Sequence, residues 1–497
     1  MLASRSAGFE GRRRCRLDGP FPQMRAVFPN EPLAQVFVEP SQQQQAARDA
    51  DFVRSQLPSK GLFEGHDWRV ALEPFPISQE LHGELQTLGR VLLQFNRALN
   101  LLYRLSVSGK QPAWVSQWLD IGKPPEVVEL QRHPTFKNEL PRVIRPDVLL
   151  TDNGFSITEL DSVPGGIGLT AWLNQTYSQL PAPSPVASGA SETRNVVGGP
   201  AGMLEGFRGI FGAAPGVHII VSEESATYRP EMEWIAGQLG EGRFKVRDSR
   251  ATAFDPGDAV YRFFELYDAP NVASSQTIFE LAQARQIVLT PPPKPLFEEK
   301  MVFALLWNRN LRSFWRQELG ESFLNRLQKR VPYTWFVDPQ PLPPHAAVPL
   351  LEITDWRQLK ALSQKERDLI LKVSGFAANA WGSRGVFLGS DLSSADWAAA
   401  VDQAISGADS SPFVLQQFHR PGIVETKWWD PVAGAIQTMK GRARLCPYYF
   451  VEGEAENARA TLRGILATTC PADKKIIHGM RDAVLAPCAV DSPSPDR

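Results

Sequence analysis

A short turn between two alternating stretches constrains this chain more than any other part of its sequence. Residues 145–151 and 155–161 alternate apolar and polar side chains, and Asp152-Asn153-Gly154 stands between them. Such alternation predicts two strands, and a glycine ending a three-residue loop suits the left-handed position of a β-hairpin. The expected cross-strand pairs are Thr151–Phe155, Leu149–Ile157, Asp147–Glu159 and Arg145–Asp161.

This register gathers charge, because residues two apart lie on the same face of a strand. The face holds one guanidinium and three carboxylates, namely Arg145, Asp147, Glu159 and Asp161. Carboxylates that face each other repel unless a cation lies between them. Oxygen ligands of this kind suit Mg²⁺ that is also bound by phosphates. The alternatives are a solvated hairpin and a two-residue Asn-Gly loop, which would place Asp147 opposite Leu160.

A glycine-rich segment follows the hairpin. Gly165, Gly166 and Gly168 precede an expected helix at 169–177. Free N–H groups at such a helix start can bind an anion, although the same residues can also form a simple flexible turn.

The rest of the chain predicts several further regions. Apolar residues at steps of three and four indicate a helix from Ser78 to about residue 106, with Ser78 as its N-cap. Residues 423–450 are expected to be antiparallel strands with a turn at Pro431–Gly434. Strand signals alternate with helical patterns between residues 217 and 289, which favours a mainly parallel sheet, and no GxGxxG motif follows the first strand. The expected regions are a flexible arm (1–60), a helical region with the hairpin (61–178), a Pro/Ser/Gly-rich linker or loop (179–200), an α/β subdomain (201–290), a mixed region (291–488) and a polar tail (489–497, with polar character from about Pro487).

Composition excludes several classes of protein. The 497 residues carry 53 Lys+Arg and 54 Asp+Glu, so no overall charge favours nucleic acid or an anionic membrane. No apolar run reaches the roughly 18 residues of a membrane span. The four cysteines form no CxxC pair, which disfavours a zinc cluster and a disulfide framework. Unpaired thiols suit a reducing compartment, and we expect a cytoplasmic protein.

A second group of candidate residues surrounds an expected strand at 369–372. The strand ends at Lys372, and the segment 374–385 contains three glycines that would let its backbone approach a ligand. Lys372 and Arg384 could neutralise phosphates that loop amides bind. The GK[ST] sequence of a Walker A motif is absent, and an ordinary surface loop is the alternative. The other candidates in this loop are Ser374, Gly375, Gly382 and Gly385.

Three further places complete the set. Lys300 begins an expected helical stretch and could reach the same phosphates, or it could be an exposed helix lysine. A strand at 413–418 ends in Gln416, Gln417 and Phe418, whose backbone could bind an adenine edge or simply form a sheet edge. Arg444 shares a strand face with Arg442 and points toward an anion or an acidic partner.

Taken in order, these pieces resemble the circularly permuted ATP-grasp family, which includes the bacterial glutathionylspermidine-synthase-like proteins. Ordinary ATP-grasp enzymes present the phosphate-binding lysine, the glycine loop and the adenine hinge before the acidic strand. Here the acidic strand, with Glu159 and Asp161, precedes Lys372, the loop and the hinge. The resemblance covers about residues 70–488 and implies an α+β ATP-grasp fold in permuted order. It also implies an α/β (Rossmann-like) subdomain, a helical N-terminal region, and nucleotide-binding subdomains at 291–488.

The resemblance also implies roles for single residues. Asp147, Glu159 and Asp161 match the Mg²⁺ ligands, and Lys300 and Lys372 match the lysines that bind the nucleotide phosphates. Ser374 to Gly385, with Gly375, Gly382 and Arg384, matches the loop over the phosphates. Gln416, Gln417 and Phe418 match the adenine hinge, and Arg145 and Arg444 resemble arginines that steady a transferred phosphoryl group. Two features depart from the pattern: Asp161 stands where Asn is usual, and the loop is rich in alanine.

The function implied is that of an ATP- and Mg²⁺-dependent ligase joining a carboxylate to an amine through an acyl phosphate. The cofactors would be ATP and Mg²⁺, and the substrates a small-molecule or peptide carboxylate and an amine, without nucleic acid or membrane. Two alternatives stay open. One is a nucleotide-binding scaffold or regulator without ligase activity, and the other is a phosphotransferase on the same fold.

Overall fold

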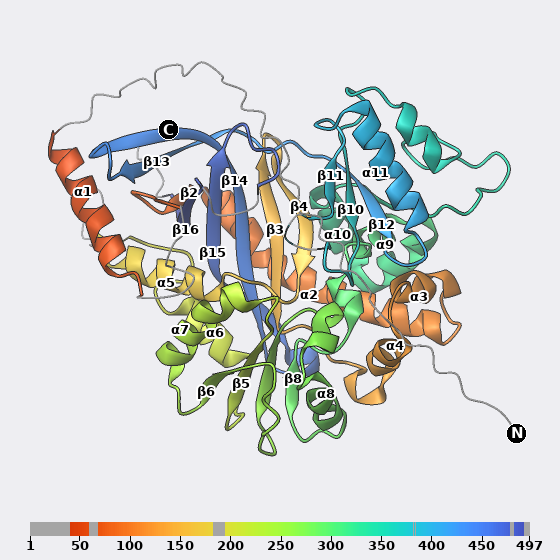
Figure 1. Cartoon of the computed structure of the whole chain (residues 1–497), viewed down its shortest axis with the longest axis horizontal. Helices are drawn as coiled ribbons and strands as arrows, with labels where there is room; N and C mark the ends of the chain where they lie inside the picture. The colour runs from red at the N-terminus through yellow and green to blue at the C-terminus, as the bar shows by residue number, and fades with distance from the viewer. Residues whose placement is uncertain are drawn as a thin grey trace, which may run out of the picture.

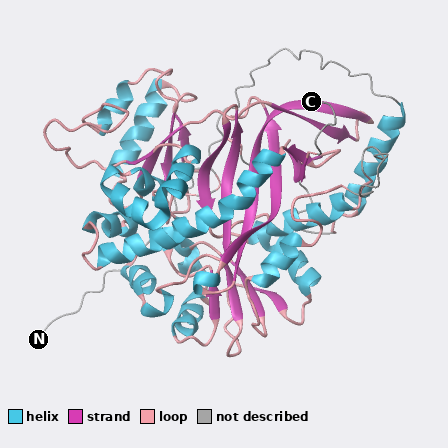
Figure 2. Cartoon of the chain, turned by 180° about the vertical axis from the view of Figure 1, so that it is seen from behind, coloured by secondary structure: helices cyan, strands magenta, loops and turns pink. Residues whose placement is uncertain are grey.

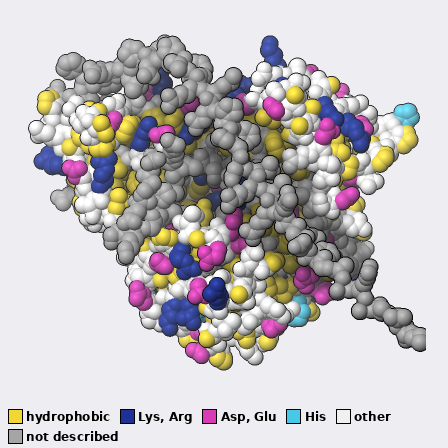
Figure 3. All heavy atoms as spheres, in the orientation of Figure 1, with side chains coloured by type: hydrophobic (Ala, Val, Ile, Leu, Met, Phe, Trp, Pro, Cys, Tyr) yellow, Lys and Arg dark blue, Asp and Glu magenta, His cyan; other side chains and the backbone are white. Residues whose placement is uncertain are grey.

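The computed structural model describes residues 40–58, 68–181, 194–380, 382, 384–477 and 482–491. Their strands form three sheets, and helices lie around and between them (Figure 1). The expected α+β class is confirmed at this level. On the face shown in Figure 3, basic and acidic side chains are intermixed, in keeping with the net charge near zero. No helix among the described residues is both long and apolar enough to cross a membrane.

The largest sheet joins strands from distant parts of the chain. Its order is β1-β16-β15-β14-β3-β4, with β13 beside β14 and β2 beside β16. The bounds are β1 (Arg69–Val70), β2 (Phe75–Ile77), β3 (Val143–Thr151), β4 (Gly154–Asp161), β13 (Val424–Asp430), β14 (Ala435–Glu452), β15 (Arg459–Pro471) and β16 (Val484–Val490). The antiparallel β13–β14 pair confirms the hairpin expected within residues 423–450. The expected regions 61–178 and 291–488 therefore share one sheet.

The C-terminal end of the chain differs from the expected polar tail. Residues 484–490 form β16, which lies inside the large sheet between β15 and the short strands β1 and β2. Pro487 is the register partner of Leu466, and Cys488 that of Phe75. The tail prediction was wrong for residues 487–490, because they continue an apolar and mostly buried strand, whereas residues 492–497 lie outside the described part of the chain.

Part of the expected N-terminal arm is a helix. Residues Pro40–Ser55 form α1, which contacts β13 and β14. Ala46, Ala50 and Val53 recur at steps of three and four and are buried, so one helix face has a packing partner. The arm prediction was therefore wrong for this segment, whereas residues 1–39 lie outside the described part of the chain.

The long helix expected from Ser78 is confirmed as α2 (Gln79–Val107). The Ser78 hydroxyl oxygen accepts the Leu81 N–H at 3.1 Å and caps the helix start. Figure 2 shows a long helix crossing the large sheet from behind, and the Tyr449 hydroxyl on β14 donates to the Leu85 carbonyl at 2.6 Å. The neighbouring helices are α3 (Ala113–Asp120), α4 (Pro125–Arg132), α5 (Ile167–Ser178) and α6 (Gly202–Gly209).

The α/β pattern near the middle of the chain is confirmed. Its four strands pair in parallel in the order β6-β5-β7-β8. The bounds are β5 (Val217–Val221), α7 (Arg229–Leu239), β6 (Phe244–Arg247), β7 (Ala259–Phe263), α8 (Ser275–Gln283) and β8 (Val288–Thr290). The buried run in β5 reflects a parallel strand that is covered on both faces.

The third sheet is antiparallel and has the order β11-β10-β12-β9. It has its own core, in which Trp397 of α11 is fully buried against β10 and β12. The bounds are α9 (Val302–Trp307), α10 (Arg312–Arg330), β9 (Thr334–Phe336), β10 (Leu369–Val373), β11 (Val386–Leu388), α11 (Ser394–Ser406) and β12 (Phe413–Gln417).

Candidate nucleotide and metal site

The β3–β4 hairpin pairs its charged residues as predicted, although the turn and the pairs next to it differ from the prediction. Asp147 faces Glu159 and Arg145 faces Asp161. The turn is tighter than expected, since Thr151 pairs with Gly154, and the predicted Thr151–Phe155 and Leu149–Ile157 pairs are wrong. A register shift between Asp147 and Val148 compensates for the tighter turn. The pairs Asp147–Glu159 and Arg145–Asp161, on the far side of the shift, are therefore as predicted.

The shift leaves Thr158 as the extra residue on β4, opposite no single partner. A β-bulge of this kind removes a residue from the ladder and turns its backbone groups outward. The Thr158 carbonyl accepts the Lys372 ammonium at 3.1 Å. The irregularity therefore gives the lysine of another sheet a partner on the acidic hairpin.

Arginines hold the inner carboxylate of the hairpin. Arg145 Nη2 lies 3.2 Å from Asp147 Oδ1 and 2.9 Å from Asp161 Oδ2. Arg444 Nη1 of β14 lies 3.0 Å from Asp147 Oδ2. Burial disfavours the charged form of Arg444, but the Asp147 carboxylate outweighs it and raises the pKa of that guanidinium. Burial also raises the pKa of Asp161, against the opposing effect of Arg145.

Glu159 has a lysine partner instead. Lys300 Nζ lies 2.8 Å from Glu159 Oε1 and donates to the Ala380 carbonyl at 2.5 Å. Burial opposes the charge of Lys300, but Glu159 outweighs it and raises the pKa of the ammonium. The predicted repulsion among the three carboxylates is thus balanced by side-chain cations.

The fit to Mg²⁺ differs among the three expected ligands. Within the described residues, no group of three or more His, Cys, Asp or Glu side chains is arranged to hold a metal. The Asp147 side chain is 12% exposed and lies between two guanidinium groups. Glu159 and Asp161 keep 35% and 25% of their side-chain surface exposed and line the same cavity. They are the two candidates for a cation bound together with phosphates. For them to bind it, Lys300 would have to leave Glu159, and Asp161 would have to release Arg145 or the Val163 N–H.

Lys372 enters the site from β10. It is buried, and its ammonium donates to Gln416 Oε1 at 2.9 Å as well as to the β4 bulge. Burial lowers the pKa of Lys372 to about 8, despite the opposing effect of Glu159. Burial therefore disfavours the charged form of Lys372 while the cavity holds no anion, and a bound anion would stabilise that form.

Fewer of the expected residues of the glycine loop line the cavity than predicted. Gly382 lines the cavity, whereas Ser374, Gly375, Arg384 and Gly385 do not. Ser374 is fully buried, and the half-exposed Arg384 reaches Glu224 at 2.8 Å. Gly385 begins the turn into β11, and its carbonyl accepts the Val373 N–H at 3.0 Å. Within the loop, Trp381 and Ser383 lie outside the described residues.

The expected hinge is the end of β12: Gln416 and Gln417 are the last residues of the strand, and Phe418 follows it. Gln416, Gln417 and Phe418 all line the cavity. The Gln417 N–H donates to the Tyr333 carbonyl at 2.9 Å, and the Phe418 N–H donates to the Asp368 carbonyl at 3.0 Å. The backbone of this segment is consequently fixed at the end of β12, which lies between β10 and β9 in the antiparallel sheet.

The N–H groups of the glycine-rich helix start already bind a carboxyl group of the chain itself. The Glu231 carboxylate of α7 accepts the Gly166 N–H at 2.7 Å and the Leu169 N–H at 3.1 Å. Burial raises the pKa of Glu231 to about 7, against the effect of these N–H groups. The Tyr448 hydroxyl and Arg145 Nη1 both donate to the Gly165 carbonyl, at 2.8 and 3.2 Å. This segment therefore positions Arg145 and does not present an open anion site.

The lining residues named above surround one cavity of about 260 Å³, to which all three sheets contribute. Sequence reasoning missed its third wall, at the carboxyl ends of the parallel strands. Ser225 follows β5, Glu265 follows β7, and Tyr228 directly precedes α7. Ligands of open α/β sheets bind at strand carboxyl ends, so the polar residues after these strands were the signal that could have found this wall. Arg262 and Glu298 form a fully buried ion pair of 2.6 Å beneath it.

The architecture is that of a glutathione-synthetase-like α+β fold. A glutathione synthetase-like effector from Globodera pallida shares this fold with a TM-score of 0.51 at 12% identity, over 91% of this chain and 98% of that one. A protein named as a gamma-glutamylcysteine synthetase from Methylobacillus flagellatus aligns at 12% identity over 81% and 90% of the two chains. Its TM-score of 0.35 is too low to indicate a common fold. No family model and no curated protein sequence matches the chain.

Proposed function

We propose that this chain is an ATP- and Mg²⁺-dependent ligase that joins a carboxylate to an amine. The observation that carries the proposal is the convergence of Lys300, Lys372, Arg145 and Arg444 with the acidic strand β4 around one cavity. Phosphoryl transfer needs positioning and charge stabilisation rather than a nucleophilic side chain, and this cavity offers those groups. The fold shared with a glutathione synthetase-like protein supports the same class of reaction.

The ATP-grasp assignment and the permuted order are part of the proposal. The acidic strand β4 precedes β10 and β12 in the chain, although all three strands border the cavity. Adenine would lie at the hinge of Gln416 to Phe418, with the phosphates directed toward Lys372, Lys300 and the hairpin.

The chemistry has two steps. A substrate carboxylate oxygen attacks the γ-phosphorus of ATP, which forms an acyl phosphate and releases ADP. The amine nitrogen then attacks the acyl carbon, and phosphate leaves as the amine loses a proton. Bound Mg²⁺ would neutralise charge on the phosphate oxygens. Arg145 and Arg444 would hold the transferred phosphoryl group, and Glu159 and Asp161 are the carboxylates available to the metal.

A second candidate function is a nucleotide-binding protein without ligase activity. The observation that favours it is the pairing of every expected metal carboxylate with an arginine or a lysine. A phosphotransferase on the same fold would use the same cavity, but it would leave the phosphoryl group on its substrate.

A thermal-shift titration of ATP, with and without Mg²⁺, tests the common premise. A ligand that binds only the folded state raises the melting temperature by mass action. We expect a Mg²⁺-dependent shift in the wild type that is lost in the Asp147→Ala/Glu159→Ala double variant. Phosphate release that requires an added amine would identify the ligase, and phosphate retained on the substrate would identify the phosphotransferase. No shift in the wild type would refute all three functions.

A further inference from the structure

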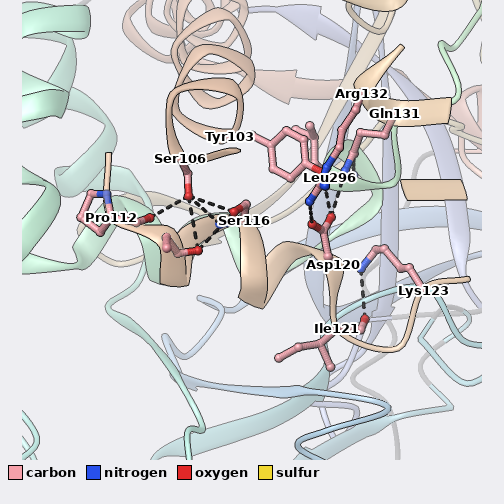
Figure 4. A network of polar contacts seen from close by, with 11 residues as sticks. Tyr103, Ser106, Pro112, Ser116, Asp120, Ile121, Lys123, Gln131, Arg132 and Leu296 are labelled. Atoms are coloured by element: carbon pink, nitrogen blue, oxygen red, sulfur yellow. Dashed lines mark hydrogen bonds and ion pairs between the residues drawn. The ribbon is translucent and has the colours of Figure 1, made fainter. Parts of the chain in front are cut away.

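A lysine from the N-terminal helical region reaches the back of the site. Lys123 follows α3, whose last residue, Asp120, accepts hydrogen bonds from Tyr103 at 2.8 Å and Arg132 at 2.6 Å (Figure 4). The end of α3 is therefore held firmly, and the chain that leaves it has a fixed direction.

The turn that leads into Lys123 packs closely on the antiparallel-sheet region. Gly122 has a φ of +72°, and a Cβ there would lie 2.0 Å from the carbonyl oxygen of Ser410. Only glycine permits both the backbone conformation and this close approach. The Lys123 side chain consequently enters the interior between the two regions.

Inside, Lys123 begins a buried network. Its Nζ lies 2.5 Å from Glu299 Oε1, with side-chain exposures of 0% and 1%. The Ser374 hydroxyl donates to the other Glu299 oxygen, and Ser374 Oγ accepts the Met301 N–H at 2.9 Å. The Lys300 N–H donates to the Ser374 carbonyl, also at 2.9 Å. Three segments far apart in the sequence are thus joined directly behind Lys300.

The same network fixes the start of the glycine loop. A Cβ at Gly375 would lie 2.6 Å from the Glu298 carbonyl oxygen, so this residue must be small for the two segments to meet. Phe376 has a φ of +48°, and the Lys123 ammonium lies 5.6 Å from its ring centroid. Beyond this point the loop turns toward the cavity, where the Ala380 carbonyl accepts Lys300 Nζ.

We propose that Lys123, Glu299 and Ser374 are positioning residues, which hold Lys300 and the root of the loop 376–385 in place at the nucleotide site. The inference rests on the proposed function, and none of the three residues lines the cavity. An ion pair this deeply buried needs matched geometry and further hydrogen bonds, and the Ser374 hydroxyl supplies one of them to Glu299. It also gives Ser374 a structural task in place of the phosphate contact expected from sequence.

Hydrogen exchange of the ligand-free protein tests the positioning directly. We expect Ser374→Ala and Lys123→Met to speed exchange of the amides at 300–301 and 376–380 by about tenfold, the factor expected from one lost hydrogen bond. Ser106→Ala is a matched control, because Ser106 is also buried and its oxygen accepts the Ser116 N–H at 3.0 Å. Ser106→Ala should change the exchange rates of amides near α3 and leave the rates at 300–301 and 376–380 unchanged. Unchanged exchange in Ser374→Ala would refute the network as a support.

Calorimetric titration of ATP with Mg²⁺ then tests the role in binding. We expect each single variant to raise Kd by about tenfold below its melting temperature, and the Ser374→Ala/Lys123→Met double variant to be no worse than the weaker-binding single variant. Ser106→Ala, although destabilised, should keep the wild-type Kd. Additive effects, or an unchanged Kd in both single variants, would overturn the proposal. A wild type that binds no ATP refutes the proposed function and the binding role, while the exchange data still decide whether the support exists.

Discussion

Arg444 Nη1 lies 3.0 Å from Asp147 Oδ2, although 297 positions separate the two residues in the chain. The contact crosses from β14 to β3, which are neighbours in the large sheet. Because Arg145 binds the other Asp147 oxygen, one carboxylate orients both guanidinium groups of the cavity. This relationship makes Asp147 as much a support for the arginines as a candidate metal ligand.

Asp147→Asn should therefore destabilise the protein by about 2 to 4 kcal/mol. The value lies near the lower end for breaking a buried pair, since the three side chains remain 12–18% exposed. Asp368→Asn is the matched control, because both Asp368 oxygens bind Arg420 on the exposed surface, and it should cost less than about 1 kcal/mol. Urea denaturation measures both. Equal effects of the two substitutions would show that Asp147 does not hold the arginines.

Nucleotide affinity should depend on the protonation of Lys372. Burial lowers the pKa of the free ammonium to about 8, and bound phosphates would raise it. Affinity should therefore be constant below pH 8 and fall above it, with proton uptake on binding near pH 8 to 9. Calorimetry in buffers of different ionisation enthalpy detects that uptake. Lys372→Arg stays charged in this range and should abolish the uptake; if the wild type takes up no protons, Lys372 does not meet the phosphates.

Glu159→Gln should affect metal-free and metal-bound ATP in opposite directions. Lys300 is paired with Glu159, so without metal this carboxylate would repel the phosphates of bound ATP and compete with them for Lys300. We expect the Gln variant to bind metal-free ATP several-fold more tightly, and to lose most of the gain that Mg²⁺ gives the wild type, as measured by thermal shift. Glu224→Gln removes a charge that binds Arg384 instead, and should do neither. Full Mg²⁺ dependence in Glu159→Gln would rule out Glu159 as a metal ligand.

The stability contribution of Glu231 should fall as pH rises. Its pKa is about 7 in the folded protein against an ordinary value of 4.5, so the folded state binds more protons within that window. Stability relative to Glu231→Gln should decrease from pH 4.5 to 7 by roughly 3 kcal/mol and level off above it. Denaturation of both proteins from pH 5 to 8 gives the difference, in which the histidines cancel. A constant difference would mean that Glu231 keeps an ordinary pKa.

Local sequence patterns predicted much of the fold. The α2 cap at Ser78, the parallel β5–β8 sheet and the β13–β14 hairpin follow from periodicity and turn residues over short stretches. The facing of Asp147 and Glu159 was also predicted, although the turn and the bulge at Thr158 were not. The bulge could not be predicted locally, because its carbonyl binds Lys372, which belongs to another sheet.

The rest depends on contacts that no local pattern contains. Ser374 looked like part of a ligand loop, but its buried partner is Glu299, which is itself bound to the distant Lys123. The Gly166 helix start looked open because Glu231, 65 positions later, gives no sign of its partner in the sequence. In both cases the sequence indicated groups able to bind a partner, but that partner is another residue of the chain and not a ligand.

The position of β16 has a consequence for how the chain is made. Strands β1 and β2, near residues 69–77, pair with a strand that is synthesised more than four hundred residues later, at 484–490. Pairing between strands so far apart in the sequence forms slowly, because closing the long intervening chain costs entropy before the strands can pair. During synthesis, β1 and β2 would stay without this partner until residues 484–490 have been made, whereas β15 (Arg459–Pro471) would wait only briefly for β16. The segment that contains β1 and β2 therefore stays unpaired while more than four hundred residues are added, and early association of a chaperone with that segment would matter most.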